Sequence, residues 1–299
     1  MAAQPPDLAL STGSAIGDVG APTVATGSRT KLDLELWIPA TLLLLLAGAC
    51  FLWPLIDHGL PSPIVGNLLT SSNVLPLSRG HLFGTDPLGD DILSRVLYGG
   101  RVSLEVGLGV NAIGLVVGGV LGMVAGYKGG AIELLIMRVL DMLLAFPSLV
   151  LALVVAEYLG PSELHVIFAI SFFSVPAFAR LSRTATLRTR GQRFVTASRH
   201  AGTSDRRILL RHIAPNVLPQ LLTFSLLGVA FVILFEATLS FLGLGVPPPN
   251  PSWGNMIAQG QNYLSTDPYL VIIPAAFLCF TVICLNLLGD AVRARIAAQ

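Results

Sequence analysis

The chain has 299 residues, of which 53% are hydrophobic and only 12% are charged, and its formal net charge is +1. A water-soluble domain with a mean hydropathy of +0.74 could not hide so much apolar surface, so this class of protein is excluded. The composition indicates an integral membrane protein. The three cysteines, Cys50, Cys279 and Cys284, lie in apolar segments, where packed thiols are expected rather than disulfides or metal ligands.

Residues 1–30 are rich in Ala, Pro, Gly, Ser and Thr, and they lack the basic start and short apolar core of a signal peptide. We predict a disordered tail here. The apolar segment 37–56 follows, and at ~1.5 Å per residue it is long enough to cross a hydrocarbon core about 30 Å thick. Arg29 and Lys31 precede it, so the N-terminus is expected in the cytoplasm.

An external segment is expected over residues 57–101. Asp86 followed by Pro87 predicts a helix start, because a capping carboxylate precedes a residue that suits the first helical position. Asp91 and Arg95 are four residues apart and are expected to pair along that helix. A calcium site built from the aspartates is the alternative, but EF-hand spacing is absent, so capping is preferred.

Five further apolar segments of spanning length follow, at 102–127, 134–159, 164–181, 217–242 and 269–288. The first of these carries a glycine every four residues, at Gly114, Gly118, Gly122 and Gly126. Such a stripe lets two helix backbones approach closely, so it predicts a helix-packing face. No P-loop pattern occurs, so a nucleotide site of that kind is not expected in this chain.

Polar residues and prolines interrupt several of these spans. Arg138 and Asp141 are three apart and are expected to pair; structural bracing is preferred over a proton-relay role for Asp141. For Glu236, a hydrogen bond between helices is preferred over contact with substrate. Pro147 predicts a kink in the third span, and Pro176 predicts a break in the fourth.

The most polar stretch is FVTASRHAGTSDRRILLRHIAPNVL, residues 194–218. Nine of the 18 Lys and Arg lie between positions 180 and 211, and Asp205 is the only acid among them. The pattern predicts helix, turn, helix, with Gly202 in the turn at positive φ and Thr203 or Ser204 as the cap of the second helix. That helix places apolar residues on one face and arginines mostly on another; the apolar residues are Ile208, Leu209 and Ile213.

Three interpretations of this stretch are possible from its residues. It is a basic loop that only fixes topology, an arm that binds nucleic acid, or a docking element for a soluble partner. Flanking membrane spans disfavour nucleic acid. The stretch resembles the cytoplasmic EAA loop of binding-protein-dependent ABC importer permeases, whose pattern is Glu-Ala-Ala, three residues, Gly, and a later Pro. Here the matching positions are Thr196, Ala197, Ser198, Gly202 and Pro215.

Three other stretches carry the same resemblance. HLFGTDPLGDDILSRVL resembles an external motif of these permeases, with Asp90 where the family usually has Arg. MRVLDMLLAFPSL resembles the start of their third span. The strongest match is EATLSFLGLGVPPPNPSWGNM, in which Gly243 and Gly245 are expected to end a helix and Trp253 is expected to anchor the loop at the membrane interface.

The resemblance covers about residues 80–295 and is closest to the C-type subunit of dipeptide, oligopeptide and nickel permeases. It implies an all-α domain over 31–299, with six transmembrane helices of type I importer fold and a cytoplasmic coupling loop at 186–215. It also implies inner-membrane localisation with both termini in the cytoplasm. The residues implied in ATPase coupling are Thr196, Ala197, Ser198, Gly202, Arg206, Arg207, Arg211 and Pro215.

As a family member, the chain is expected to form half of a pathway for di- and oligopeptides, with nickel or glutathione-like compounds as the alternative. The implied partners are a second permease, two ATPase subunits that bind ATP and Mg, an external binding protein and membrane lipid. No catalytic residues or metal site are expected in this chain, because it lacks H-E-x-x-H and G-x-S-x-G patterns. A stand-alone secondary transporter is disfavoured, since no internal repeat is visible.

Overall fold

The structure is a computed structural model that describes residues 28–56, 74–78, 81–160, 162–247 and 250–297. Nearly all of the predicted tail and the first part of the predicted external segment, 57–73, lie outside these residues. The described part is almost entirely helical, and its extended structure is limited to two isolated bridges. Five helices are long and apolar enough to cross a membrane, and a bent pair of helices forms the sixth candidate span.

Two of the long apolar helices contain a π-helical turn, and three others, α1, α6 and α11, run beyond the predicted spans. The elements in chain order are α1 (Ser28–Ile56), α2 (Ile92–Ile113), η1 (Gly114–Gly118), α3 (Gly119–Lys128), α4 (Gly130–Leu144), α5 (Ser148–Leu159), α6 (Glu163–Arg190), α7 (Arg193–His200), α8 (Asp205–Ile208), η2 (Leu209–Ile213), α9 (Ala214–Phe241), α10 (Trp253–Gly260), η3 (Gln261–Tyr263) and α11 (Tyr269–Ala297). The helix from α2 to α3 is unbroken, and so is the helix from α8 to α9, each over 37 residues.

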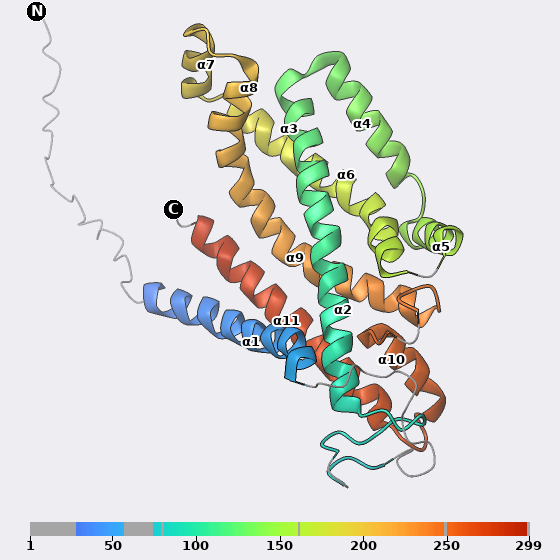
Figure 1. The fold of residues 1–299 in the computed structure, drawn as a ribbon. Helices are drawn as coiled ribbons and strands as arrows, with labels where there is room; N and C mark the ends of the chain where they lie inside the picture. Colours follow the sequence, from blue (N-terminus) through green and yellow to red (C-terminus); the bar gives the residue numbers. More distant parts are fainter. Residues whose placement is uncertain (1–27, 57–73, 79–80, 161, 248–249, 298–299) are drawn as a thin grey trace, which may run out of the picture.

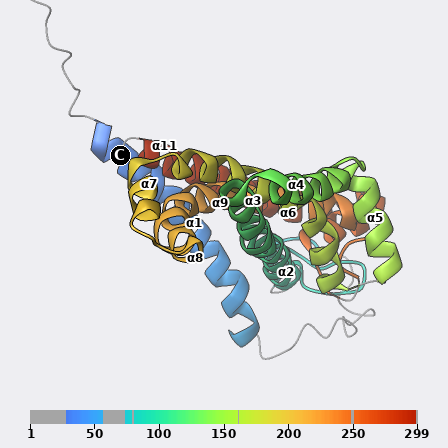
Figure 2. The same cartoon turned by 90° about the horizontal axis from the view of Figure 1, so that it is seen from above.

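The long helices pack as an elongated bundle (Figure 1). Helices α2–α3, α6 and α9 form the middle of the bundle, where α3 packs on α6 and α2 packs on α9. Figure 2 shows α1 and α11 toward one side and α4 and α5 toward the other. Helices α7 and α8 lie at one end of the bundle beside the junction of α3 and α4, and α10 lies at the opposite end.

The predicted span 134–159 is two helices rather than one kinked helix. Helices α4 and α5 meet at an angle of 85°. Pro147 stands at the N-cap of α5 with φ −57° and ψ 122°, an extended conformation that cannot continue α4. Proline has no N–H to donate to the preceding turn, so the bend is sharper here than the predicted kink.

Pro176, by contrast, lies within an unbroken helix, and the break predicted there is wrong. Helix α6 runs through this buried proline and continues to Arg190, beyond the predicted end of the span at 181. The helix is held on both sides of the proline by close packing of its small residues against α3 and η1. Neighbouring helices of this kind let membrane helices tolerate an internal proline.

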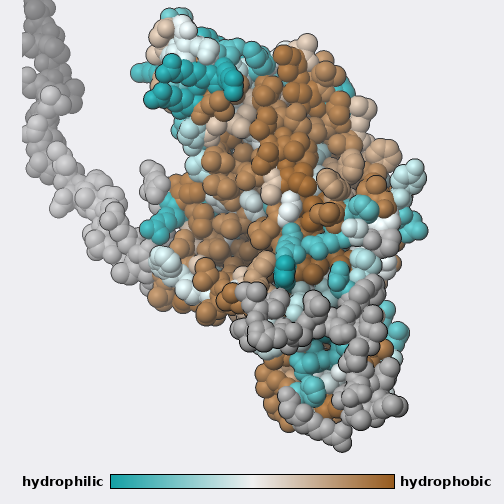
Figure 3. Space-filling view, viewed as in Figure 1, coloured by the Kyte–Doolittle hydropathy of each residue, from teal (hydrophilic) through white to brown (hydrophobic). Residues whose placement is uncertain are grey.

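Figure 3 shows how polarity is distributed over one face of the molecule. Hydrophobic residues cover the middle of the bundle, and hydrophilic residues gather over α7 and α8 and again toward the end that carries α10. This apolar middle and these polar ends are what a chain embedded in a bilayer requires.

Candidate functional site

The helix-turn-helix at one end of the bundle is built around a left-handed glycine. Helix α7 ends at His200, and Gly202 follows with φ +75°. The backbone N–H of Thr203 donates to the carbonyl of Ser198 over 3.1 Å, which closes the turn. A Cβ added at Gly202 would meet no atom within 4 Å. The positive φ predicted from the sequence is therefore present, and backbone conformation rather than space demands the glycine.

A tyrosine and a lysine at the end of α3 hold the second helix in place. Ser204 occupies its N-cap position, but the hydroxyl makes no capping bond. Asp205 instead accepts hydrogen bonds from Tyr127 Oη at 2.7 Å and from Lys128 Nζ at 2.6 Å. The Arg199 guanidinium lies 5.4 Å from the centre of the Tyr127 ring, within cation–π range. The sequence pointed to capping alone and missed this anchor.

The apolar face of the second helix packs inside the chain. Ile208 and Ile213 are fully buried, and Leu209 is partly buried against the same cluster. The cluster includes Val195 from α7 and Phe178 from α6. The burial of this face indicates that it braces the turn.

The remaining positions of the helix-turn-helix form an exposed, basic surface. Thr196, Ala197 and Gly202 are exposed, whereas Ser198 is half-buried and donates to the Phe194 carbonyl at 2.9 Å. Exposed residues of the second helix are Arg206, Arg207, Arg211 and Pro215. Within the described part of the chain, no acid forms an ion pair with any of these three arginines. We name these eight positions the coupling surface.

The coupling surface continues into the membrane as one helix. The π-helical turn Leu209–Ile213 precedes Pro215, which stands in the first turn of α9. Proline cannot donate a hydrogen bond to the preceding turn, and the wider π turn at this point lets the helix pass it unbroken. The Asn216 side chain also donates to the His212 carbonyl at 2.6 Å. Helices α8 and α9 are therefore parts of one continuous helix.

The glycine stripe lies against α6. A Cβ at Gly118 would collide with the Val175 carbonyl, and one at Gly122 would collide with the Ala179 carbonyl. Gly114 and Gly126 face α6 in the same way. The Ser182 hydroxyl donates to the Gly119 carbonyl at 2.7 Å across this contact. This closeness to α6 requires glycine at each of the four positions, although at Gly114 the colliding atoms belong to the Ser174 and Phe178 side chains rather than to the backbone.

Charged pairs join α4 to α6. Asp141 accepts from Arg180 at 2.6 Å, so the predicted pairing with Arg138 is wrong. Glu133 forms a second ion pair with Arg183, one turn nearer the coupling surface. The partner of Asp141 comes from a helix that the sequence does not place beside it, which explains why the nearest arginine in sequence was the wrong choice. This geometry supports structural bracing for Asp141.

The opposite end of the bundle holds the loops before α2 through one arginine. Arg95 pairs with Asp86 and, at 3.2 Å, with Asp90, and it donates to Gln259 Oε1 of α10 at 3.1 Å. Burial and the neighbouring Asp86 raise the pKa of Asp90, and Arg95 opposes this rise. The predicted pair between Asp91 and Arg95 is therefore wrong.

Asp91, rather than Asp86, starts the helix. Its side chain accepts from the backbone N–H of Ser94 at 2.9 Å, and its other oxygen binds His81 Nδ1 at 2.8 Å. Asp86 accepts from the N–H groups of Leu88 and Asp90 in the turn before the helix. The aspartates are thus occupied by capping, turn and ion-pair contacts, and the described residues hold no cluster of metal-binding side chains.

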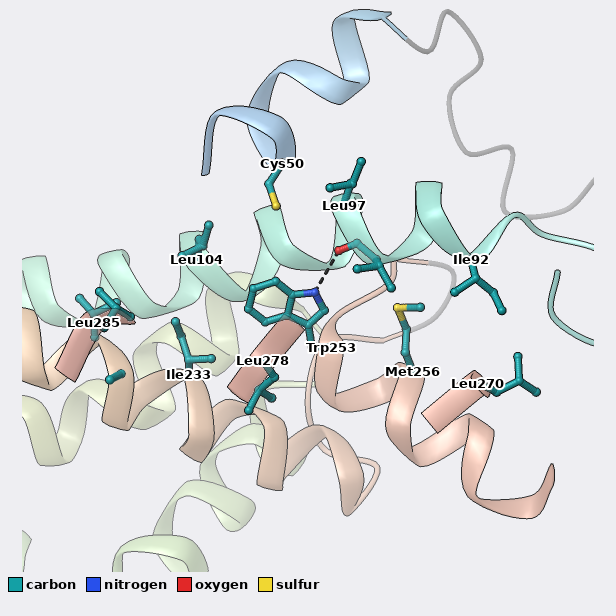
Figure 4. Packing of buried hydrophobic residues seen from close by; sticks show 13 residues of the cluster. Cys50, Ile92, Leu97, Leu104, Ile233, Trp253, Met256, Leu270, Leu278 and Leu285 are labelled. Atoms are coloured by element: carbon teal, nitrogen blue, oxygen red, sulfur yellow. Dashed lines mark hydrogen bonds between the residues drawn. The ribbon is translucent and has the colours of Figure 1, made fainter. Parts of the chain in front are cut away.

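Trp253 is buried in the core rather than anchored at the interface (Figure 4). Its indole N–H donates to the Val96 carbonyl of α2 at 3.0 Å. Ser252 caps α10, and Asn255 completes a capping box. The buried Glu236 accepts from Ser240 at 2.6 Å and from Ser103 of α2 at 3.3 Å, a hydrogen bond between helices.

Comparison with known proteins identifies the class of this fold. Residues 118–298 match the family model of binding-protein-dependent transport system inner membrane components. A putative peptide transport system permease protein of Brucella abortus is 38% identical over 96% of both chains. The chain belongs to this family of ABC importer permeases and is a multi-pass inner-membrane protein.

Other relatives carry narrower names. A dipeptide transport system permease of Alkalihalophilus pseudofirmus is 39% identical over 72% of this chain and 71% of its own. A glutathione transport system permease of Escherichia coli is 44% identical over 72% and 71% of the two chains. The inward-facing MetNI methionine ABC transporter is 18% identical and superposes with a TM-score of 0.57 over 68% of this chain and 97% of that chain, which shows the type I importer fold.

Proposed function

We propose that the chain is a non-catalytic permease subunit of an ATP-driven peptide importer, and that its coupling surface docks on an ATPase subunit. The observation that carries the proposal is an exposed basic helix-turn-helix joined without a break to a membrane-spanning helix. The family implies ATPase and substrate-binding partners. We further propose a second homologous permease and two ATPase subunits, which bind the ATP and Mg.

The mechanism follows from the continuity of α8, η2 and α9. Closure of the ATPases on ATP binding displaces the coupling surface, and α9 transmits that displacement into the bundle. The ion pairs and the glycine contact tie α4, α3 and α6 together, so these helices move as one body. The pathway then opens alternately to the two sides of the membrane.

Peptides are the proposed substrates, because the Brucella and Alkalihalophilus relatives are named peptide and dipeptide permeases. Glutathione is the second candidate, supported by the Escherichia relative and by its peptide-like chemistry. Uptake of a labelled dipeptide, labelled glutathione and ⁶³Ni²⁺ should be measured in cells that lack and regain this permease. Restored uptake of the dipeptide supports the proposal, and restored uptake of nickel or glutathione alone replaces peptide as the substrate.

The coupling role is tested by Gly202→Val. A β-branched residue strains the positive φ at this turn and misdirects both helices, while leaving every apolar span intact. We expect normal membrane insertion, a loss of uptake of at least ten-fold and weaker co-purification of the ATPase. Two matched controls keep most uptake: Gly191→Val, where φ is −76°, and Gly160→Val, which strains a glycine of φ +83° at the other end of the bundle.

Full uptake and normal ATPase association in Gly202→Val would contradict the docking role and leave the stretch as a charged topological loop. Equal losses in Gly160→Val would attribute the effect to general strain rather than to docking. A separately purified chain that transports without an ATPase would support a secondary transporter instead.

The proposed topology places 128–131, 186–215 and both termini in the cytoplasm, and 57–101 and 244–267 outside. A single cysteine at Ser204 should resist an impermeant thiol reagent in intact cells, and one at Ser265 should react. Both positions are exposed, and the exposed Cys279 is first replaced by Ser. The reverse labelling pattern would overturn the orientation.

A further inference from the structure

A groove between α3 and the second helix of the coupling surface has an apolar lining and one charge. Its volume is about 240 Å³, and its walls include Val120 and Val124 from α3 and Leu209, Leu210 and Ala214 from η2 and α9. Arg206 is the only charged residue among those that line it. Val120 and Leu210 are 50% and 62% exposed, so the groove is open on the surface of the chain.

The span predicted over residues 102–127 places the groove near the boundary between headgroups and acyl chains. Lys128 ends α3 and pairs with Asp205 at the polar surface. Val124 and Val120 lie four and eight residues earlier, so they lie about 6 and 12 Å deeper along the helix axis. An apolar groove at this depth meets acyl chains, and its charged rim meets lipid headgroups.

An anion that pairs with Arg206 at the rim of the groove has to come from outside the described part of the chain. Asp205, the acid next to Arg206 in sequence, is already bound by Tyr127 and Lys128. No ion pair joins Arg206 to any acid in the part of the chain that the structure describes. A phosphodiester is the anion that a bilayer supplies at this depth, and basic pockets beside transmembrane helices suit anionic headgroups.

We propose that this groove is a binding site for an anionic phospholipid, whose phosphate pairs with Arg206 and whose acyl chain lies along Val120, Val124 and Leu210. The bound lipid fills the space between α3 and η2 and bridges the coupling surface to the bilayer. This assigns Arg206, one of the eight positions of the coupling surface, to lipid and leaves Arg207 and Arg211, which do not line the groove, available to the ATPase. The site does not depend on the proposed coupling role, since it requires only a chain embedded in the membrane.

Photo-crosslinking of the intact complex, purified with its associated subunits, tests the site. The probe is phosphatidylglycerol with a diazirine on its acyl chain, in nanodiscs of unlabelled phosphatidylcholine, and labelled peptides are mapped by mass spectrometry. We expect label on residues 120–124 and 209–214, and several-fold less label there from the matching phosphatidylcholine probe. Added inorganic phosphate at millimolar concentration should not compete, which separates a lipid headgroup from a free anion.

Variants define the two parts of the site. Arg206→Gln should lower the labelling by phosphatidylglycerol several-fold, Arg206→Lys should largely retain it, and Arg193→Gln, an exposed arginine outside the groove, should leave it unchanged. Ala214→Phe fills the groove with the arginine intact and should lower labelling from both lipids. Each variant is compared with wild type at an equal amount of folded complex. A loss of folding is therefore not counted as a loss of lipid labelling.

Several outcomes would overturn the proposal. Equal labelling by both lipids with no effect of Arg206→Gln would mean ordinary contact with the surrounding bilayer. Absence of lipid label at residues 120–124 and 209–214, with label elsewhere on the chain, would mean that a protein partner covers the groove. Competition by inorganic phosphate would mean a free anion site.

Discussion

The two ends of the bundle stabilise their loops in different ways. At the Trp253 end, the indole, Glu236, Ser252 and Asn255 are buried, and their polar atoms bond one another or the backbone. At the coupling end, the apolar face is buried, whereas Arg206, Arg207 and Arg211 are exposed and form no ion pair with the described residues. The polar groups of the Trp253 end are buried and bonded within the chain, whereas the basic groups of the coupling end are exposed. Substitutions should therefore affect stability at the first end and transport at the second.

The largest expected effect is on stability, from Trp253→Ala. The change removes a fully buried side chain and its hydrogen bond to Val96, and losses of this kind cost ~3–5 kcal/mol in free energy of unfolding. We expect a much lower thermal midpoint and yield of the complex in detergent. Trp37→Ala, at a position 61% exposed, is the matched control and should change little. An unchanged midpoint for Trp253→Ala would remove the contrast between the two ends.

Gly122→Leu should have the next largest effect. The side chain has no room, because a Cβ alone already collides with the Ala179 carbonyl of α6. Overpacking of this type costs about 1–3 kcal/mol or more. Gly48→Leu on α1, where a Cβ meets nothing within 4 Å, is the control. Equal thermal stability of the two variants would show that the stripe tolerates separation from α6.

Ser252→Ala tests the polar half of the Trp253 end. It removes the hydroxyl that accepts from the Asn255 N–H at 3.2 Å, and the loss of an N-cap typically costs about 1 kcal/mol. Ser204→Ala removes a hydroxyl at the N-cap position of α8 that makes no capping bond, so it should leave the midpoint unchanged. Equal shifts in thermal unfolding for these two variants would contradict the observed difference in capping.

The smallest expected effect is that of Thr196→Ala. Thr196 is exposed, its hydroxyl donates only to the Gln192 carbonyl within its own helix, and it stands where the family pattern has an acid. Stability should not change, and peptide uptake should fall by a few-fold at most. A complete loss of uptake would show that this hydroxyl has taken over the role of the family's acid.

Local patterns predicted the helical class, apolar helices of spanning length and the turn at Gly202, because apolar length and a left-handed glycine are properties of consecutive residues. They also predicted that the glycine stripe would pack against another helix, although they did not identify α6. The exposed character of the basic surface follows from its composition in the same way. Family resemblance, rather than pattern, supplied the coupling role.

Contacts between distant segments could not be predicted. Asp141 is paired by Arg180, Asp205 is held by Tyr127, and Arg95 reaches Gln259, each across a separation that sequence spacing does not reveal. Trp253 was placed at the membrane interface because aromatic residues are common there, but α10 folds back against α2 and buries it. In each of these cases the side chain contacts another helix. The prediction had instead given it a partner nearby in sequence or a place at the membrane interface.

The unbroken helix from Asp205 to Phe241 converts a small tilt at one end into a larger displacement at the other end. Its 37 residues extend about 55 Å, so a tilt of about 5° at one end displaces the other by about 5 Å. A rotation this small needs little repacking along the middle of the helix, where side chains would slide by about half that distance at most. A tilt of this size displaces the distant end while every helix of the bundle between stays folded.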